Sequence, residues 1–459
     1  MSEELDAELL EAADAAGTKA PGVAPDAGKY AQQLSRGLTF KENILITLSA
    51  VTPASSVFII VPAVINGIGG ASALAFGIGA LVGVFVALCY AELSSAFPVT
   101  GGEYAFVART LGKPWGFALF MLTLISGILI IGVIACLGIR TNAWVTGVFL
   151  VLEIAALVVL TVVGFLHVTQ PISTLWTPTT SGPGGVLVPA AAGLVLSYTA
   201  TALFAFNGYG AAVYYAEETK KARSTIGRAI LWSLAIAVAA EIIPLIAVLL
   251  GTSDLAALVA SPTPMNEFLL DRAGPVLNTV VSVAIALAII NAVLAIILQI
   301  GRLLFSAARD GSWPDVINRP LAAVHPRLRT PMAATVVIGV LSALCLWLVP
   351  FDALLVATSA GIVITYLMVG IAALVGRINH TTDSAEYRMR LWPAAPVLMI
   401  VATVVIFVMN LLASWVPVAV AVGMFAIGLV YYALYLRRRP DRWTLPAPAD
   451  EELEDEATA

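Results

Sequence analysis

Eleven long apolar runs dominate this sequence, and each is close to the length that an α-helix needs to cross a membrane. A hydrocarbon core about 30 Å thick requires roughly 20 helical residues. The runs lie at residues 43–66, 71–97, 115–137, 143–168, 191–216, 229–251, 276–300, 331–350, 353–376, 391–413 and 416–436. With 60% hydrophobic and 12% charged residues, the chain is predicted to be an all-α polytopic membrane protein, and a soluble globular fold is excluded.

Polar segments flank the apolar region on both sides. Residues 1–38 are acidic at the start and contain no apolar core, so we expect a cytoplasmic disordered tail and no cleavable signal peptide. The predicted transmembrane domain covers residues 39–436, and residues 437–459 are expected to form a second, acidic cytoplasmic tail.

The sequence offers little support for a metal, a cofactor or an enzyme. Cys89, Cys136 and Cys345 all lie inside apolar runs and lack metal-ligand spacing, so we expect buried thiols, with neither a disulfide framework nor a metal site. The motifs of zinc hydrolases, serine hydrolases and ATP-driven pumps are missing from the sequence, and it carries no basic patch for nucleic acid. We therefore expect no cofactor and no enzymatic activity.

Basic residues concentrate in alternate loops, which predicts the orientation. Lys and Arg crowd the N-terminal tail, the loops at 109–113, 220–228, 302–329 and 377–390, and the tail at 437–442. Short cytoplasmic loops are enriched in basic residues. We therefore expect these loops and both termini to lie in the cytoplasm, with the protein in the cell membrane.

This orientation creates a conflict of parity. Residues 109–113 should be inside and residues 169–190, which contain no Lys or Arg, should be outside. Only the predicted helices 115–137 and 143–168 lie between them, and two crossings cannot connect opposite sides. Either residues 115–137 form a re-entrant hairpin, or the chain lacks one helix, or the basic bias misleads at Arg140.

Three sequence runs carry a resemblance to a known family. They are YAELSSAFPVTGGEYAFVARTLG from residue 90, LFAFNGYGAAVYYAEETKKARSTIGRAI from residue 203 and GRLLFSAARDGSWPDVINRPLAAVHPRLRTPM from residue 301. In order and spacing they resemble the amino acid-polyamine-organocation transporter superfamily, over about residues 38–436. The resemblance implies two inverted five-helix repeats with discontinuous first and sixth family helices. It also implies that most of the fourth family helix is missing, at the junction 128–137.

The run SAVTPASSVF places a proline in the middle of the first apolar segment. Because Pro53 removes a backbone donor and clashes with the preceding turn, we expect the helix to break there. The resemblance assigns substrate binding to the residues around it, Thr52, Ala54, Ser55 and Ser56. N–H groups of the restarted half-helix would hold a substrate carboxylate. A simple proline kink is the alternative.

A second weak point lies at FAFNGYG, residues 204–210. The resemblance implies an unwound stretch at Asn207 and Gly208, whose carbonyls would accept hydrogen bonds from a substrate ammonium. Phe204, Phe206 or Tyr209 would act as the gate. Close helix packing at the glycines is the alternative.

Ionisable groups inside apolar runs are expensive and are usually functional, since each costs about 2.5–3.5 kcal/mol at the bilayer centre. Glu153 and Glu241 are two such carboxylates, and we expect them to face the interior and to couple transport to protons. The resemblance places Glu153 where some relatives carry a lysine in place of a sodium ion. Asn291 is a weaker candidate for the ion site. Neutral acids bonded to nearby backbone are the alternative.

A set of charged residues is predicted near the cytoplasmic helix ends, either as a gate network or as ordinary solvated charges. The set comprises Glu92, Glu103, Glu217, Glu218, Arg302, Arg309 and Asp310.

Together these features predict a secondary active transporter, or permease, of amino acids or related amines. Alternating access would carry a small-molecule substrate across the lipid bilayer, with a proton as the coupling ion in preference to sodium. The alternative is a non-transporting or inactive truncated permease relative that acts as a sensor or partner, which the apparent loss of a helix motivates.

Overall fold

Helices form most of the described structure. In a lipid environment the backbone N–H and C=O groups of a long apolar segment find no water, and an α-helix pairs them with one another. The computed structural model describes residues 29–30, 37–134, 143–325, 330–348, 351–445 and 447–448. The chain divides into two units, Leu34–Trp443 and the two ends of the chain. Within the unit of the ends, β1 (Lys29–Tyr30) pairs in parallel with β4 (Ala447–Pro448).

The larger unit is a succession of helices. Up to residue 166 they are α2 (Phe40–Val51), α3 (Pro53–Ser55), the π-helix η1 (Ser56–Ile60), α4 (Val61–Ile68), η2 (Gly69–Ala71), α5 (Ser72–Ala96), α6 (Glu103–Thr110), α7 (Lys113–Ile134) and α8 (Ala143–Leu166). A short segment with η4 (Ile172–Trp176), β2 (Thr179–Ser181), η5 (Pro183–Gly185) and β3 (Leu187–Pro189) follows, in which β2 and β3 pair antiparallel.

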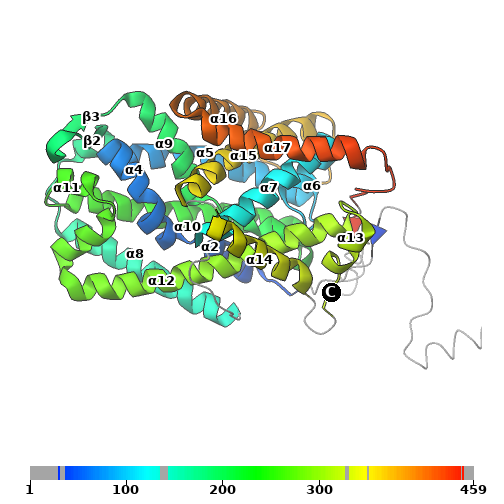
Figure 1. The fold of residues 1–459 in the computed structure, drawn as a ribbon, viewed down its shortest axis with the longest axis horizontal. Coiled ribbons are helices and arrows are strands. Elements are labelled where there is room, and N and C mark those ends of the chain that lie inside the picture. The colour runs from blue at the N-terminus through cyan, green and yellow to red at the C-terminus, as the bar shows by residue number, and fades with distance from the viewer. Residues whose placement is uncertain are drawn as a thin grey trace, which may run out of the picture. The chain divides into compact units, whose positions relative to one another are not determined.

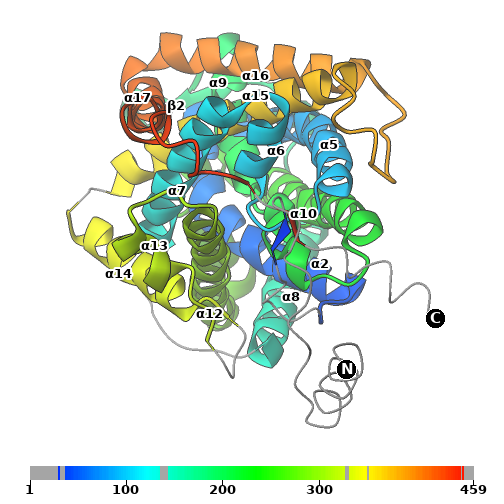
Figure 2. The same cartoon turned by 90° about the vertical axis from the view of Figure 1, so that its right-hand side faces the viewer.

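The remaining helices run from residue 192 to residue 436. They are α9 (Ala192–Phe206), the 3₁₀-helix η6 (Tyr209–Glu218), α10 (Ala222–Gly251), α11 (Leu255–Ala260), α12 (Pro264–Arg309), α13 (Asp315–Leu321), α14 (Met332–Leu348), α15 (Phe351–Ile378), α16 (Ala394–Ala413), α17 (Trp415–Tyr431) and η7 (Tyr432–Leu436). Figures 1 and 2 show α16 and α17 on one side of this unit and α8 on the other.

The apolar helices identify the class of protein. Among the described residues, seven helical stretches are long and apolar enough to cross a membrane, and two shorter apolar helices accompany them. Large apolar side chains face outward, such as Trp347 at 89% and Leu412 at 75% exposure. Extensive apolar surface of this kind indicates a lipid-facing exterior. The prediction of an all-α polytopic membrane protein is confirmed.

Arginines define one end of the larger unit, which we call the basic end. Arg309 pairs with Glu217, which also accepts the N–H of Thr100, and Arg377 pairs with Glu92 nearby on α5. The opposite end lies where Arg272 donates to the carbonyl of Gly251 and to Thr169. In Figure 1, α13 lies toward the basic end and α11 toward the opposite end.

Helix α12 is longer than the apolar pattern predicts. The predicted segment 276–300 is its middle part, and the helix continues past Arg302 to Arg309 at the basic end. Before that segment, Gly274 has φ 80° and ψ 173°, and Pro275 follows it, so the helix turns sharply at this point.

Residues 115–137 are not a hairpin, because α7 is a single continuous helix from Lys113 to Ile134. An added Cβ on Gly127 would meet Ile300, and Phe117 contacts Trp313, so α7 runs away from the basic end. The re-entrant alternative is therefore wrong. The remainder of the junction predicted at 128–137, residues 135–137, lies outside the described residues.

Helix α8 runs in the same direction as α7. Its Gly164 lies against the backbone of Ala247 and Gly251, near the end of α10 that contacts Arg272. Both α7 and α8 thus point toward the opposite end. Two consecutive helices that each cross a membrane once would point in opposite directions. The shared direction of α7 and α8 therefore agrees with the charge pattern, which places residues 109–113 and 169–190 on opposite sides.

Candidate functional site

The first membrane helix is interrupted where the proline predicts. Helix α2 ends at Val51, Thr52 adopts the left-handed conformation with φ 48° and ψ 69°, and α3 restarts at Pro53. Left-handed geometry costs a non-glycine residue about 1–3 kcal/mol and tends to persist at functional sites. The predicted discontinuity of this helix is confirmed.

The second interruption lies at Asn207 and Gly208. Helix α9 ends at Phe206, Asn207 is extended with ψ 146°, and Gly208 has φ 118°. The chain then continues as the 3₁₀-helix η6 from Tyr209. This break is also confirmed.

The two interruptions touch each other. A Cβ added to Gly208 would lie 2.7 Å from the backbone nitrogen of Val51, and the Ser56 hydroxyl donates to the carbonyl of Ala205 at 2.9 Å. Residues about 150 positions apart in the chain therefore form one unit of irregular backbone. Such backbone is tolerated at membrane depth only where protein or a cavity surrounds it.

A cavity of about 120 Å³ opens beside this unit. Six of the predicted substrate-binding residues line it: Thr52, Ser55, Ser56, Phe204, Asn207 and Gly208. Tyr209 lines a smaller neighbouring cavity of about 20 Å³. Ala54 lines neither of these two cavities.

Ala54 instead has a partner within the protein. Its N–H donates to Oε1 of Glu153 at 2.8 Å, and Glu153 is fully buried. A carboxylate in this position occupies the N-terminus of the restarted helix, where the helix dipole favours negative charge. The contact of Ala54 with substrate stays a prediction.

Glu241 lies close to Glu153. It is fully buried on α10, beside Ser56, and it interacts electrostatically with Glu153. The second oxygen of Glu153 has no hydrogen-bond partner in the described part of the chain. The third predicted coupling residue, Asn291, is also buried, and its amide atoms find no partner among the residues that the structure describes.

Several cavity-lining residues were not singled out from the sequence. They include Tyr90, Tyr214 and Tyr366. Gln299 also lines the cavity, as does Glu103, which the sequence predicts only as one of the charges near the helix ends. The Tyr366 hydroxyl donates to Oδ1 of Asn207 at 3.1 Å. Tyrosine is common in any helical protein, so only its position in the fold reveals its place at this cavity.

The charges predicted to cluster at one end separate into distinct groups. Arg302 binds both oxygens of Glu218, and Arg309 binds Glu217 at 2.8 Å. These pairs connect η6 to α12 at the basic end.

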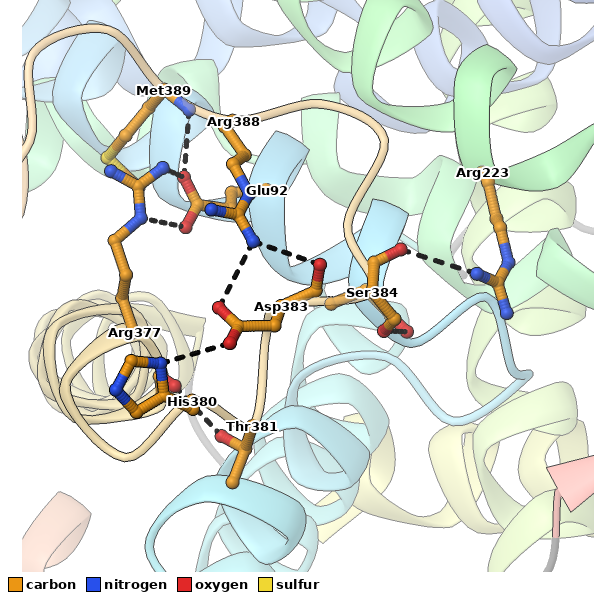
Figure 3. Close-up of polar contacts among 11 residues, drawn as sticks. Glu92, Arg223, Arg377, His380, Thr381, Asp383, Ser384, Arg388 and Met389 are labelled. Carbon is orange, nitrogen blue, oxygen red and sulfur yellow. Dashed lines mark hydrogen bonds and ion pairs between the residues drawn. The ribbon is translucent and has the colours of Figure 1, made fainter.

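A third pair joins α5 to the last turn of α15. Arg377 binds both oxygens of Glu92, which also accepts the N–H of Met389 at 2.8 Å (Figure 3). Glu103 belongs to neither arrangement, because its partners are the hydroxyls of Tyr90 and Tyr214.

Comparison with known proteins gives a consistent family match. The family model described as amino acid permease matches residues 38–131 and 121–434. The two matched stretches share residues 121–131, which lie in α7.

Individual relatives are similar along most of their length or most of this chain. The branched-chain amino acid permease of Bacillus subtilis is 24% identical, over 80% of this chain and 85% of its own. The methylthioribose transporter of the same organism is 25% identical over 89% and 95%. Cationic amino acid transporter 4 of Homo sapiens is 23% identical over 72% and 58%.

Proposed function

This chain belongs to the amino acid permease family, and from that premise we propose that it is a secondary active transporter working by alternating access. Its relatives are permeases and transporters, not enzymes, so the chain is a transporter of amino acids or related compounds. The proposed substrate is an amino acid or a related amine. The observation that carries the proposal is the meeting of two interrupted helices at one cavity.

The chemistry of the cavity suits a zwitterionic substrate. The first turn after Pro53 presents the positive end of a helix dipole, together with the hydroxyl of Ser55, to a carboxylate. The last turn of α9, at Phe204, presents carbonyls to an ammonium, and Asn207 adds a side-chain amide. A substrate bound between the breaks would connect the two halves of the transporter.

The basic end is proposed to face the cytoplasm of a cell membrane, with both chain termini on that side. The ion pairs Arg302–Glu218 and Arg309–Glu217 then hold η6 against α12 on the cytoplasmic side. Alternating access requires these pairs to separate when the substrate is released inward, because η6 continues directly from the broken α9.

A proton is the proposed coupling ion. Two buried carboxylates that interact without a paired cation are costly when both are charged. The Glu153–Glu241 pair is therefore suited to hold a proton, next to the serine that links both breaks. Protonation of Glu153 would weaken its hold on the Ala54 N–H and free that donor.

A second candidate function is that of a non-transporting relative that binds a substrate as a sensor. The parallel course of α7 and α8 favours it, because a missing crossing alters the first half of the transporter. Ligand-induced thermal stabilisation without flux would support this function in place of transport.

Uptake into proteoliposomes tests the proposal. Purified protein should take up at least one radiolabelled amino acid or amine saturably, and an inwardly directed proton gradient should accelerate uptake. Binding that never leads to uptake would favour the sensor, and the absence of both binding and uptake across amino acids and polyamines would contradict both functions.

Glu153→Gln tests the coupling role. The substitution keeps an acceptor for the Ala54 N–H but cannot exchange a proton, so uptake should lose its dependence on the proton gradient. Glu267→Gln, an exposed acid in the first turn of α12, is the matched control and should keep that dependence. Unchanged coupling in Glu153→Gln would exclude Glu153 as the coupling site.

A further inference from the structure

Four elements bring one carboxylate and three tyrosines together at the edge of the main cavity. Glu103 is the first residue of α6, and Tyr90, Tyr214 and Tyr366 come from α5, η6 and α15. Glu103 is only 7% exposed, and it lines both the main cavity and the small one.

The carboxylate of Glu103 has hydrogen bonds but no positive partner. Tyr90 donates to Oε1 at 2.9 Å, and Tyr214 donates to Oε2. In the described part of the chain no basic side chain forms an ion pair with it, whereas Glu92, Glu217 and Glu218 each bind an arginine. A carboxylate offers about four lone-pair sites, so Glu103 can accept further hydrogen bonds from a cation.

The small cavity provides room for such a cation. Its volume is about 20 Å³, and a site needs about 10–15 Å³ to hold one water-sized group. Polar groups of Glu103, Asn207, Gln299 and Tyr366 surround it, and all four residues also line the main cavity. A substrate held between the helix breaks can therefore extend into it.

Aromatic rings complete the surroundings of the small cavity. The ring centroids of Tyr90, Tyr209 and Tyr366 lie 6.4–6.5 Å from one another. Aromatic rings attract cations through their negative faces. Carboxylate and rings favour the same kind of ligand.

We propose that Glu103, with Tyr90, Tyr209 and Tyr366, forms a second cation site at the small cavity, and that the substrate carries a second amine beside its α-amino group. This inference rests on the proposed function, because it assigns the substrate class of the same cavity. The substrate is then a diamine or a basic amino acid. Its α-amino end lies at the helix breaks, and its distal ammonium lies against Glu103.

Electrostatics at Glu103 agree with an incoming cation. Burial raises the pKa of the Glu103 carboxyl above its ordinary value, and the hydrogen bonds from Tyr214 and Tyr90 oppose that rise. A positive group in the small cavity would oppose it further by favouring the ionised form.

A pair of matched ligands tests the proposal on the purified full-length protein. Lysine and 2-aminoheptanoate share the α-amino acid group and a side chain of equal length, but only lysine ends in an ammonium. Wild-type protein should bind lysine at least about tenfold more tightly, because only lysine can form a charge-assisted hydrogen bond with Glu103. Competition binding and proteoliposome uptake measure the ratio.

Glu103→Gln should remove this preference selectively. We expect lysine affinity to fall about tenfold or more, while 2-aminoheptanoate affinity stays within about twofold. Glu103→Asp keeps the charge and should retain part of the preference. The exposed Glu267→Gln should behave as the wild type.

The wild-type protein alone also tests the proposal if Glu103→Gln fails to fold. Affinity should rise along 2,4-diaminobutyrate, ornithine and lysine until the ammonium reaches Glu103, with no parallel rise for uncharged analogues. Uptake of 2-aminoheptanoate without any preference for lysine would overturn the second cation site and leave the permease intact. Equal loss of both ligands in a folded Glu103→Gln would also overturn it, and a protein that binds neither ligand contradicts both proposals.

Discussion

Gly208 is the single residue on which the second helix break depends most directly. Its φ of 118° is a conformation that residues with a Cβ rarely adopt. An added Cβ would also lie 2.7 Å from the backbone nitrogen of Val51, which is too close for any real contact. Absence of a side chain lets the two breaks touch.

Gly208→Ala should therefore destabilise the protein and abolish uptake. The backbone strain alone costs about 1–3 kcal/mol, and the contact with Val51 would force the two breaks apart. Melting temperature in detergent and uptake in proteoliposomes measure the two effects. Gly193→Ala is the control, because the space around this exposed helical glycine is open. If Gly208→Ala had the same melting temperature and uptake as Gly193→Ala, the role of Gly208 would be contradicted.

Residue chemistry also explains which site residues could be predicted. Proline and glycine disturb a helix in any sequence, so Pro53 and Gly208 could be recognised as breaks. A carboxylate such as Glu153 is conspicuous in any apolar run. The Ala54 partner of Glu153 lies 99 positions away, so only folding reveals it. Glu103 follows two glycines, and the sequence predicts it only as one of the charges near the helix ends. Its place at the cavity depends on α5, η6 and α15, which come together only in the fold.

At the scale of elements, buried ion pairs connect helices at the basic end. Glu92 on α5 is 1% exposed and binds Arg377 at the end of α15. The guanidinium of Arg377 also lies over the ring of Trp392. Because Glu92 accepts the N–H of Met389 as well, it fixes the segment between α15 and α16 against α5 (Figure 3).

Glu92→Gln should loosen this segment. Removing one partner of a buried ion pair costs about 3–5 kcal/mol, and partial exposure of Arg377 puts the expected loss at the low end. Trypsin should cleave after Arg388 and Arg390 faster than in wild type. Asp383→Asn, in the exposed pair with Arg388, should change stability by about 1 kcal/mol or less, and equal cleavage of the two variants would contradict the role of Glu92.

The helix boundaries show where apolar patterning succeeds and where it fails. Predicted segments locate α7, α8, α14 and α16 well, because their ends coincide with the ends of apolar runs. The pattern misses the extension of α12 to Arg309, since Arg302 interrupts the apolar run while the backbone remains helical. It also reads α9 and η6 as one segment, although the change to a 3₁₀-helix occurs at Gly208.

At the scale of the whole molecule, charge counting and the fold agree on an unusual first half. Parity of the basic loops requires an odd number of crossings between residues 109 and 169, and α7 and α8 do point the same way. The family match is also divided at this place, with residues 121–131 matched twice. Both observations concern the helices around the first break, so they bear directly on whether the transporter works.

In the second half of the molecule, one segment of chain connects the cavity to the basic end. Helix α9 breaks beside the cavity, η6 continues from the break to the basic end, and α12 binds η6 through two arginines. Substrate bound at the breaks can therefore influence the ion pairs through one continuous segment of chain.

A structure of the protein with a bound substrate tests the central claim most directly. After uptake assays identify a transported amino acid or amine, density for it should lie between Thr52–Ser56 and Phe204–Gly208, with its carboxylate toward Ser55 and its amine toward the end of α9. Density at another place, with that cavity empty at saturating substrate, would contradict the claim that the two helix breaks form the transport site.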